Sequence, residues 1–251
     1  MNQQPCPVCA SMSTALDVVD FNKSCEEPRG KYLPLSGIPI YYFLCDNCDF
    51  CFSPEICAWS INDFETKIYN NDYVMVDPDY VDNRPRQNAE YLVNMFSNQK
   101  AAIRHLDYGG GEGMLSRLLR EQGFDSTSYD PFVDKHITNE ELGKFNLITA
   151  FEVFEHVPSV NELKKKLVSL LSDDGIILFS TLLSDGHIKR HERLTWWYAS
   201  PRNGHISLYS NKSLSIIAKQ EQFAFGSFSD GFHIFCHRVV PIWASHIINL
   251  S

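Results

Sequence analysis

Apolar positions alternate between strand-like runs and helical stripes over most of the chain beyond residue 84. Residues 84–99 carry Ala89, Leu92, Val93 and Phe96 at the i, i+3, i+4, i+7 spacing of an amphipathic helix. After them, apolar runs of strand length alternate with segments of helical spacing. The predicted strands occupy residues 103–108, 126–130, 146–151 and 175–181, and the predicted helices between them occupy 113–122 and 160–171. This βαβαβ order is typical of a parallel sheet covered on both faces, so we expect an α/β fold.

Further elements are predicted on either side of this pattern. Residues 61–70 are predicted to form a short helix, and residues 71–83, rich in Asp, Asn and Tyr, an ordered loop. Ser210 is a suitable N-cap for a helix over 211–220. Two more strands are predicted near residues 223–229 and 232–238.

Composition narrows the class of protein. The chain has 251 residues, of which 44% are hydrophobic and 21% charged, a balance typical of globular domains. Its 22 basic and 31 acidic residues give a net charge of −9, so a nucleic-acid partner is not expected. No apolar run approaches the roughly 18 residues of a membrane-spanning helix. The N-terminal segment shows no signal-peptide pattern, and we therefore expect a cytoplasmic protein with no membrane partner.

Seven of the eight cysteines fall within the first 57 residues and suggest a metal site. Cys6 and Cys9 form one C-x-x-C pair, and Cys45 and Cys48 form a second. Two such pairs can complete the tetrahedral four-thiolate site that zinc prefers, with a loop or hairpin bridging them. Because a site with four protein ligands has no open position, the zinc is expected to stabilise the fold rather than to take part in chemistry.

Three of the seven early cysteines remain outside these pairs, namely Cys25, Cys51 and Cys57. Cys51 follows Cys48 by three positions and is an alternative ligand in its place. The other interpretation is that all three are small buried apolar residues, as free cysteines usually are.

A glycine-rich segment between the first predicted strand and the next helix carries the strongest functional signal. Residues 107–113 read Asp-Tyr-Gly-Gly-Gly-Glu-Gly. Glycines here allow a tight turn and a close approach of a ligand to the backbone, and the following helix presents free N–H groups. The segment lacks the Gly-Lys-Ser/Thr ending of an ATP-binding P-loop, which excludes that class.

This D-x-G-x-G-x-G segment, together with the acid that closes the second strand, resembles class I S-adenosylmethionine (AdoMet)-dependent methyltransferases over residues 84–238. The resemblance implies that Asp107 orients the methionine amino end of AdoMet and that Asp130 binds the ribose hydroxyls. It assigns close cofactor approach to Gly109, Gly111 and Gly113. It also implies a Rossmann-like seven-stranded methyltransferase fold, to which the cysteine pairs add a small N-terminal zinc-binding module. The expected boundaries are residues 1–60 for the module, 61–100 for a helical linker or cap, and 101–251 for the methyltransferase domain.

A second stretch, Phe-Glu-Val-Phe-Glu-His-Val-Pro at 151–158, is similar to the E-x-x-E-H segment of small-molecule methyltransferases. The resemblance implies that Glu152 lines the cofactor. Phe132 is our candidate for contact with the adenine. His156 and His205 are candidate catalytic bases, since a histidine near neutrality can deprotonate an acceptor. His156 has a structural alternative as a helix cap or pocket wall.

The segment 187–198 is basic and aromatic, with Lys189, Arg190 and Arg193 followed by two tryptophans. One interpretation is a lid that binds an anionic or aromatic acceptor. The other is a surface loop whose tryptophans pack into the core.

The whole chain is similar to a bacterial subset of these enzymes with an N-terminal cysteine-knuckle module, on the stretches VDFNKSC, YNNDYV and WWYASPRNGHISLYS. This resemblance implies AdoMet-dependent methyl transfer without identifying the acceptor, and on the E-x-x-E-H segment we expect a small-molecule acceptor. Two alternatives stay open: an RNA methyltransferase that reads RNA with its zinc module, and a non-catalytic AdoMet-binding protein. The acceptor and the oligomeric state cannot be deduced from the sequence.

Overall fold

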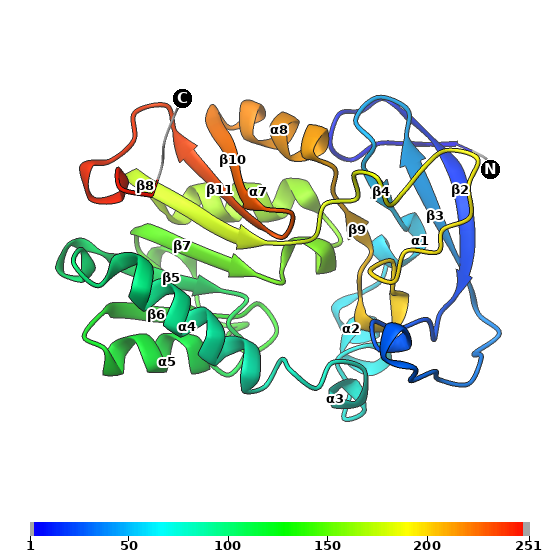
Figure 1. Cartoon of the computed structure of the whole chain (residues 1–251), viewed down its shortest axis with the longest axis horizontal. Helices are drawn as coiled ribbons and strands as arrows, with labels where there is room; N and C mark the ends of the chain where they lie inside the picture. The colour runs from blue at the N-terminus through cyan, green and yellow to red at the C-terminus, as the bar shows by residue number, and fades with distance from the viewer. Residues whose placement is uncertain (1–2, 248–251) are drawn as a thin grey trace. The chain divides into compact units, whose positions relative to one another are not determined.

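The computed structural model describes residues 3–247 and divides the chain into two units (Figure 1). Unit 1 comprises the described parts of Met1–Pro78, Phe154–Leu163 and Thr181–Ile217. Unit 2 comprises the described parts of Asp79–Val153, Lys164–Ser180 and Ala218–Ser251. Each unit is therefore assembled from three separate stretches of sequence.

Unit 2 is built on a six-stranded sheet. Its strands are β5 (Arg104–Tyr108), β6 (Asp125–Tyr129), β7 (Phe145–Phe151), β8 (Leu171–Ser180), β10 (Phe223–Ser229) and β11 (Phe232–His237). The strand order is β10-β11-β8-β7-β5-β6. Strands β6, β5, β7 and β8 are parallel to one another, whereas β11 runs antiparallel to β8 and to β10.

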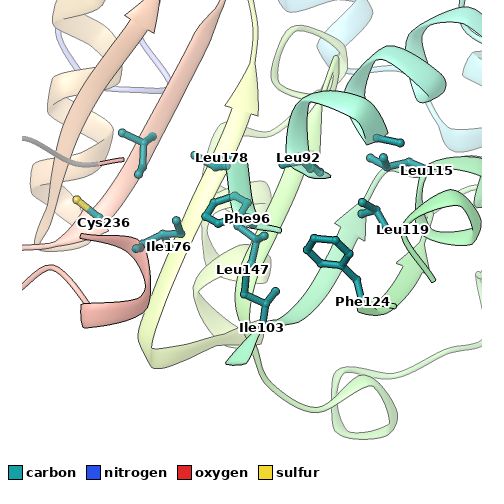
Figure 2. Packing of buried hydrophobic residues seen from close by; sticks show 13 residues of the cluster. Leu92, Phe96, Ile103, Leu115, Leu119, Phe124, Leu147, Ile176, Leu178 and Cys236 are labelled. Carbon is teal, nitrogen blue, oxygen red and sulfur yellow. The ribbon is translucent and has the colours of Figure 1, made fainter. Parts of the chain in front are cut away.

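Helices α4 (Asn83–Phe96) and α5 (Met114–Glu121) pack on this sheet (Figure 1). Unit 2 also contains α6 (Asn139–Leu142), the larger part of α7 (Val160–Leu170), the last residues of α8 (Asn211–Gln220) and the short 3₁₀ turns η2 (Lys100–Ala102) and η5 (Ile242–Ala244). Leu92 and Phe96 of α4 and Leu119 of α5 pack onto the sheet residues Leu147 and Leu178 (Figure 2). Each such buried side chain stabilises the fold by about 1.5–3 kcal/mol relative to an exposed one. The predicted apolar stripe of α4 therefore lies on its core-facing side.

The predicted Rossmann-like α/β class is confirmed, but the described residues form six strands in this sheet rather than the expected seven. No strand forms between β6 and β7, where the chain makes turns and the short helix α6. This segment has no apolar run of strand length, and a capping box of Thr138 and Glu141 starts α6 instead.

Unit 1 contains a five-stranded antiparallel sheet. Its strands, in spatial order, are β1 (Gln3–Pro5), β2 (Met12–Asp20), β3 (Pro39–Cys45), β4 (Cys51–Phe52) and β9 (Ser207–Leu208). Strands β2 and β3 form the hairpin that connects the two C-x-x-C pairs. Strand β9, which lies far along the chain, completes the sheet by pairing Leu208 with Cys51.

Short helices surround this sheet. They are η1 (Glu27–Arg29), α1 (Pro54–Cys57), α2 (Ile61–Lys67), α3 (Tyr73–Val76), η3 (Phe154–His156) and η4 (Pro201–Asn203). The predicted loop over 71–83 is wrong in part, because it contains α3 and the first residue of α4. The side chains of Tyr73 and Val76 are buried, which stabilises this helical turn despite its polar surroundings. Within the described residues, every helix is too short or too polar to cross a membrane.

Candidate functional site

The glycine loop connects β5 to α5 and takes backbone conformations that favour glycine. Gly109, Gly111 and Gly113 have φ angles of 76°, 52° and 73°. Gly113 is the N-cap of α5, and a Cβ at Gly109 would lie 2.5 Å from Cγ2 of Val153. At Gly111, by contrast, a Cβ would meet no atom within 4 Å. The loop is thus closely packed at Gly109 and open at Gly111, where a ligand can approach the backbone.

Gly110 is a residue of this loop that the D-x-G-x-G-x-G spacing treats as variable. A Cβ at Gly110 would lie 2.2 Å from Oγ of Ser128 and 2.5 Å from Oδ2 of Asp107. Any side chain here would therefore displace the carboxylate beneath the loop. In the sequence, the run of three consecutive glycines indicates that position 110 requires glycine.

The predicted cofactor residue Asp107 lies at the end of a buried chain of hydrogen bonds. Thr149 donates to Oδ1 of Asp107 over 3.0 Å, and Oγ1 of Thr149 lies 2.9 Å from Nε2 of His105. Nδ1 of His105 lies in turn 2.8 Å from Oγ of Ser126. Since the Thr149 hydroxyl proton goes to Asp107, Nε2 of His105 is the donor to Thr149. Burial lowers the pKa of His105 to about 3, so this imidazole is neutral.

Burial also raises the pKa of Asp107 to about 7, although the hydrogen bond from Thr149 lowers it. The desolvation of the carboxylate outweighs that hydrogen bond, and the neighbouring Asp130 raises the pKa further. A cation beside Asp107 would offset the cost of burying the ionised carboxylate. His105 and Thr149 were missed at the level of sequence, because nothing in the order of residues shows that three strands bring them together.

Asp130 lies just beyond β6, beside the glycine loop. Its Oδ2 accepts a hydrogen bond of 3.0 Å from the Gly111 N–H, and its Oδ1 accepts one of 2.8 Å from the Phe132 N–H. Each carboxylate oxygen retains a second lone pair and can accept a hydrogen bond from a further hydroxyl group. The structure therefore brings Asp107, Asp130 and the loop together, and it places Phe132 in the turn that follows Asp130.

Glu152 follows β7 with a φ angle of 53°, a left-handed conformation that is uncommon outside glycine. Its backbone N–H donates to Oγ of Ser180, and the Ser180 hydroxyl donates to its Oε1, both over 2.7 Å. Arg84 donates to its Oε2 over 3.3 Å. These contacts on both carboxylate oxygens hold Glu152 at the carboxyl end of β7. Sequence reasoning did not identify Arg84 or Ser180 as its partners.

The two candidate bases lie together in unit 1. The rings of His156 and His205 are 4.8 Å apart between centroids. Nδ1 of His205 is 2.8 Å from the Tyr198 carbonyl oxygen, an atom that only accepts, so Nδ1 carries the proton and Nε2 the lone pair. The fully buried Glu155 accepts a 2.6 Å hydrogen bond from the Tyr198 hydroxyl. Glu155 and Tyr198 extend the predicted pair of histidines to a four-residue cluster.

The four cysteines of the two C-x-x-C pairs also converge. Sγ of Cys6 lies 3.6 Å from Sγ of Cys48, and Sγ of Cys9 lies 3.4 Å from Sγ of Cys45. All four sulfurs lie within 4.8 Å of one another. The pKa of Cys6 is lowered to about 5, chiefly by its hydrogen bond with Cys48, which favours a thiolate in the cluster.

The other early cysteines lie outside this group. Cys51 is buried in β4, and burial raises the pKa of both Cys51 and Cys57. Neither Cys51 nor Cys57 belongs to the group of four sulfurs that lie within 4.8 Å of one another. Sγ of Cys25 lies 3.7 Å from Nδ1 of His205. The structure thus favours Cys48 over Cys51 as the fourth member of the cluster.

The basic segment 187–198 binds acidic residues of its own unit. Arg190 forms ion pairs with Asp46 and Asp49, and Arg193 forms one with Asp17 over 2.8 Å. Trp196 is buried and stacks on His187. These contacts favour the structural interpretation of the segment over a lid whose arginines bind an anionic acceptor.

A family model, a curated relative and several solved structures are similar to parts of this chain. A family model described as a methyltransferase domain matches residues 80–225. The ubiquinone biosynthesis O-methyltransferase of Bordetella avium (strain 197N) is 27% identical, over 32% of this chain, and the chain spans 42% of that relative's length.

Among solved structures, the plantazolicin methyltransferase BpumL, in complex with a monoazolic desmethylPZN analog and SAH, is 16% identical. Its TM-score is 0.48, with 74% of this chain and 96% of that chain covered. Human N-acetylserotonin methyltransferase in complex with SAM is 15% identical with a TM-score of 0.47, and the match covers 62% of this chain and 53% of that chain.

Proposed function

Because this chain belongs to the methyltransferase domain family, we propose that it is an AdoMet-dependent methyltransferase that acts on a small-molecule acceptor. The observation that carries the proposal is the glycine loop of unit 2, with Asp107 beneath it and Asp130 hydrogen-bonded to its backbone. Asp107 can bind the cationic amino group of a ligand, and Asp130 can accept hydrogen bonds from the two hydroxyls of a ribose. AdoMet contains both groups. The oxygen-methylating activity in the name of the Bordetella relative supports an acceptor of low molecular mass.

The proposal assigns a role in cofactor binding to the residues of the loop and to those beside it. Asp107 would bind the AdoMet amino group, since a cation there relieves the cost of its buried carboxylate. Asp130 would accept hydrogen bonds from the ribose hydroxyls. Gly109, Gly111 and Gly113 set the path of the backbone. Further contacts with the cofactor are assigned to Phe132 and Glu152, which flank the carboxyl ends of β6 and β7.

When bound, AdoMet supplies a methyl group that is already activated by its sulfonium. The chain's own side chains then need only align the acceptor and accept a proton from it. We assign the proton acceptor to His156 or His205. Nε2 of His205 carries a lone pair, because Nδ1 donates to the Tyr198 carbonyl, and this lone pair can accept a proton from the acceptor.

The proposal also includes a structural zinc ion on Cys6, Cys9, Cys45 and Cys48. Four thiolates at about 2.3 Å from a tetrahedral zinc are about 3.8 Å apart, close to the sulfur distances within the cluster. This ion would tie the β2–β3 hairpin to the segments at its two ends. The division into a module at 1–60, a linker or cap at 61–100 and a methyltransferase domain at 101–251 stays a prediction.

The experiment that tests the proposal measures AdoMet binding by titration calorimetry. Asp130→Ala should weaken binding by about 1–3 kcal/mol, because charge-assisted hydrogen bonds are lost. Asp125→Ala is the matched control, since Asp125 is an exposed acid at the opposite end of the same strand, and it should bind AdoMet like the wild type. Equal affinities for all three proteins would refute the assignment of Asp130, and the absence of AdoMet binding to the wild type would refute the function.

A further inference from the structure

A second group of metal-ligating side chains lies in unit 1, apart from the cysteine cluster. It consists of Glu155, His156 and His205, whose candidate ligand atoms all lie within 4.8 Å of one another. We propose that these three side chains form a binding site for one divalent transition-metal ion. The proposal concerns metal binding itself: a histidine whose lone pair binds the ion cannot also be the proton acceptor assigned under the proposed function, so for that side chain the two roles are alternatives.

The backbone holds the two segments of this site together. Glu155 and His156 belong to η3, and His205 immediately precedes Ile206, whose N–H donates to the Glu155 carbonyl over 2.9 Å. The side-chain hydroxyl of Ser207 in β9 donates to the Val157 carbonyl over 3.0 Å. One main-chain and one side-chain hydrogen bond therefore hold the two segments side by side, as a preformed metal site requires.

The orientation of His205 is that of a metal ligand. Its Nδ1–H donates to the Tyr198 carbonyl, which leaves the lone pair on Nε2. Metal-binding histidines in proteins usually donate their second ring N–H to a carbonyl or carboxylate in this way, which fixes the tautomer and the ring orientation. Gly204 adds to the constraint, because a Cβ at this position would lie 3.0 Å from Nδ1 of His156.

The surroundings of Glu155 point in the same direction. Its side chain is fully buried, and the Tyr198 hydroxyl donates to its Oε1 over 2.6 Å. Nε2 of His156 lies 4.0 Å from the same oxygen. A buried carboxylate beside two imidazoles is a suitable ligand for a divalent ion, because coordination compensates its negative charge. A ligating carboxylate also commonly accepts a hydrogen bond of the kind that Tyr198 provides.

The donor set indicates which ions fit. Two imidazoles and one carboxylate suit Zn²⁺, Fe²⁺, Co²⁺ and Mn²⁺ and leave further coordination positions open. The cysteine cluster, by contrast, offers four thiolates and no open position. The two sites should therefore be distinguishable by the spectrum of a bound probe ion.

The test is a Co²⁺ titration of the reduced full-length protein whose cysteine cluster has first been filled with Zn²⁺, in the absence of AdoMet. The wild type should bind one further equivalent of Co²⁺, with weak d–d absorption and no thiolate charge-transfer band. His156→Ala and His205→Ala should lose this equivalent. His136→Ala is the matched control, since His136 is an exposed histidine outside the cluster, and it should retain it.

A second measurement keeps the result interpretable if the alanine variants fold poorly. In the wild type, the Co²⁺ complex should show two paramagnetically shifted, exchangeable imidazole N–H proton signals. Tyr198→Phe should weaken Co²⁺ binding by about tenfold or more, as the loss of an outer hydrogen bond does at other sites, whereas Tyr41→Phe on the surface should not. Failure of the wild type to bind a further equivalent, or retention of it by folded histidine variants, would overturn the proposal. Because AdoMet binding is measured separately through Asp130, either proposal can fail without the other.

Discussion

At the scale of single residues, the glycine loop places two carboxyl groups in different surroundings. Asp130 accepts two backbone N–H bonds at the edge of the loop. Asp107 is buried beneath it, and burial raises its pKa to about 7. The folded protein holds this proton more tightly than the unfolded chain, in which the carboxyl has a pKa of about 3.8. The stability contributed by Asp107 is therefore complete below about pH 4 and is lost as the pH rises to about 7.

This pKa predicts a pH dependence of cofactor binding under the proposed function. The AdoMet ammonium favours ionised Asp107, so affinity should rise with pH up to about 7, and binding at about pH 6 should release a proton. Calorimetry in two buffers of different ionisation enthalpy measures that proton. Asp107→Asn keeps the shape of the side chain and reports any pH dependence that comes from AdoMet itself. If wild type and variant gave the same pH profile, Asp107 would not be the group that binds the amino end.

Gly111 offers a second test at the scale of one residue. Gly111 and Gly30 both have positive φ angles, and a Cβ at either position would meet no atom within 4 Å. Alanine at either position should cost about 1–2 kcal/mol of unfolding free energy, because left-handed backbone disfavours a Cβ. Only Gly111→Ala should also weaken AdoMet binding, since its methyl group would occupy the open face of the loop. Thermal unfolding and calorimetry of both variants check this, and an equal effect on affinity would contradict the assigned ligand position.

At the scale of secondary structure, the sequence predicts unit 2 much better than unit 1. Strands β7 and β8 of unit 2 contain continuous buried apolar runs such as Ile176–Phe179, and helices of clear periodicity lie between the parallel strands. In unit 1, β4 and β9 are two residues long and pair Cys51 with Leu208. Such short strands carry no periodic signal, and their partners are distant in sequence. Register of this kind is decided by tertiary contacts and not by local pattern.

The same reasoning explains which parts of the site were predictable. Asp107 lies near the carboxyl end of β5, and the glycines and Asp130 follow β5 and β6. The carboxyl ends of adjacent parallel strands meet at one edge of the sheet, so the proximity of these residues follows from the predicted topology. The cluster of Glu155, His156 and His205 depends instead on the hydrogen bond from Ile206 to Glu155. No local sequence pattern predicts that contact. Tyr198 likewise reaches Glu155 from a segment without regular secondary structure.

At the scale of the whole molecule, the cysteine cluster connects stretches of chain that are far apart in sequence within unit 1. Beside the cluster, the Ser210 hydroxyl donates to the Cys48 carbonyl over 2.6 Å. Arg190 donates to the Cys45 carbonyl as well as to Asp46. These hydrogen bonds attach the basic segment 187–198 and the residues just after β9 to the second C-x-x-C pair. The structural order of residues 181–217 should therefore depend on the proposed zinc ion.

Removal of that zinc should therefore loosen more than the N-terminal residues. Because binding energy at a structural zinc site is folding energy, chelation should increase amide hydrogen exchange in β1 to β4. Exchange should also increase at β9, which pairs with β4. It should increase around Arg190 as well, because Arg190 donates to the carbonyl of Cys45 in the second C-x-x-C pair. The glycine loop at 107–113 should keep its protection, since its hydrogen bonds lie within unit 2. Hydrogen-exchange mass spectrometry before chelation, after it and after Zn²⁺ is restored measures all three regions. An increase confined to the residues before Ser60 would show that the contacts of Arg190 and Ser210 do not transmit the stability of the metal site, and reduced protein that contains no zinc by elemental analysis would exclude the site altogether.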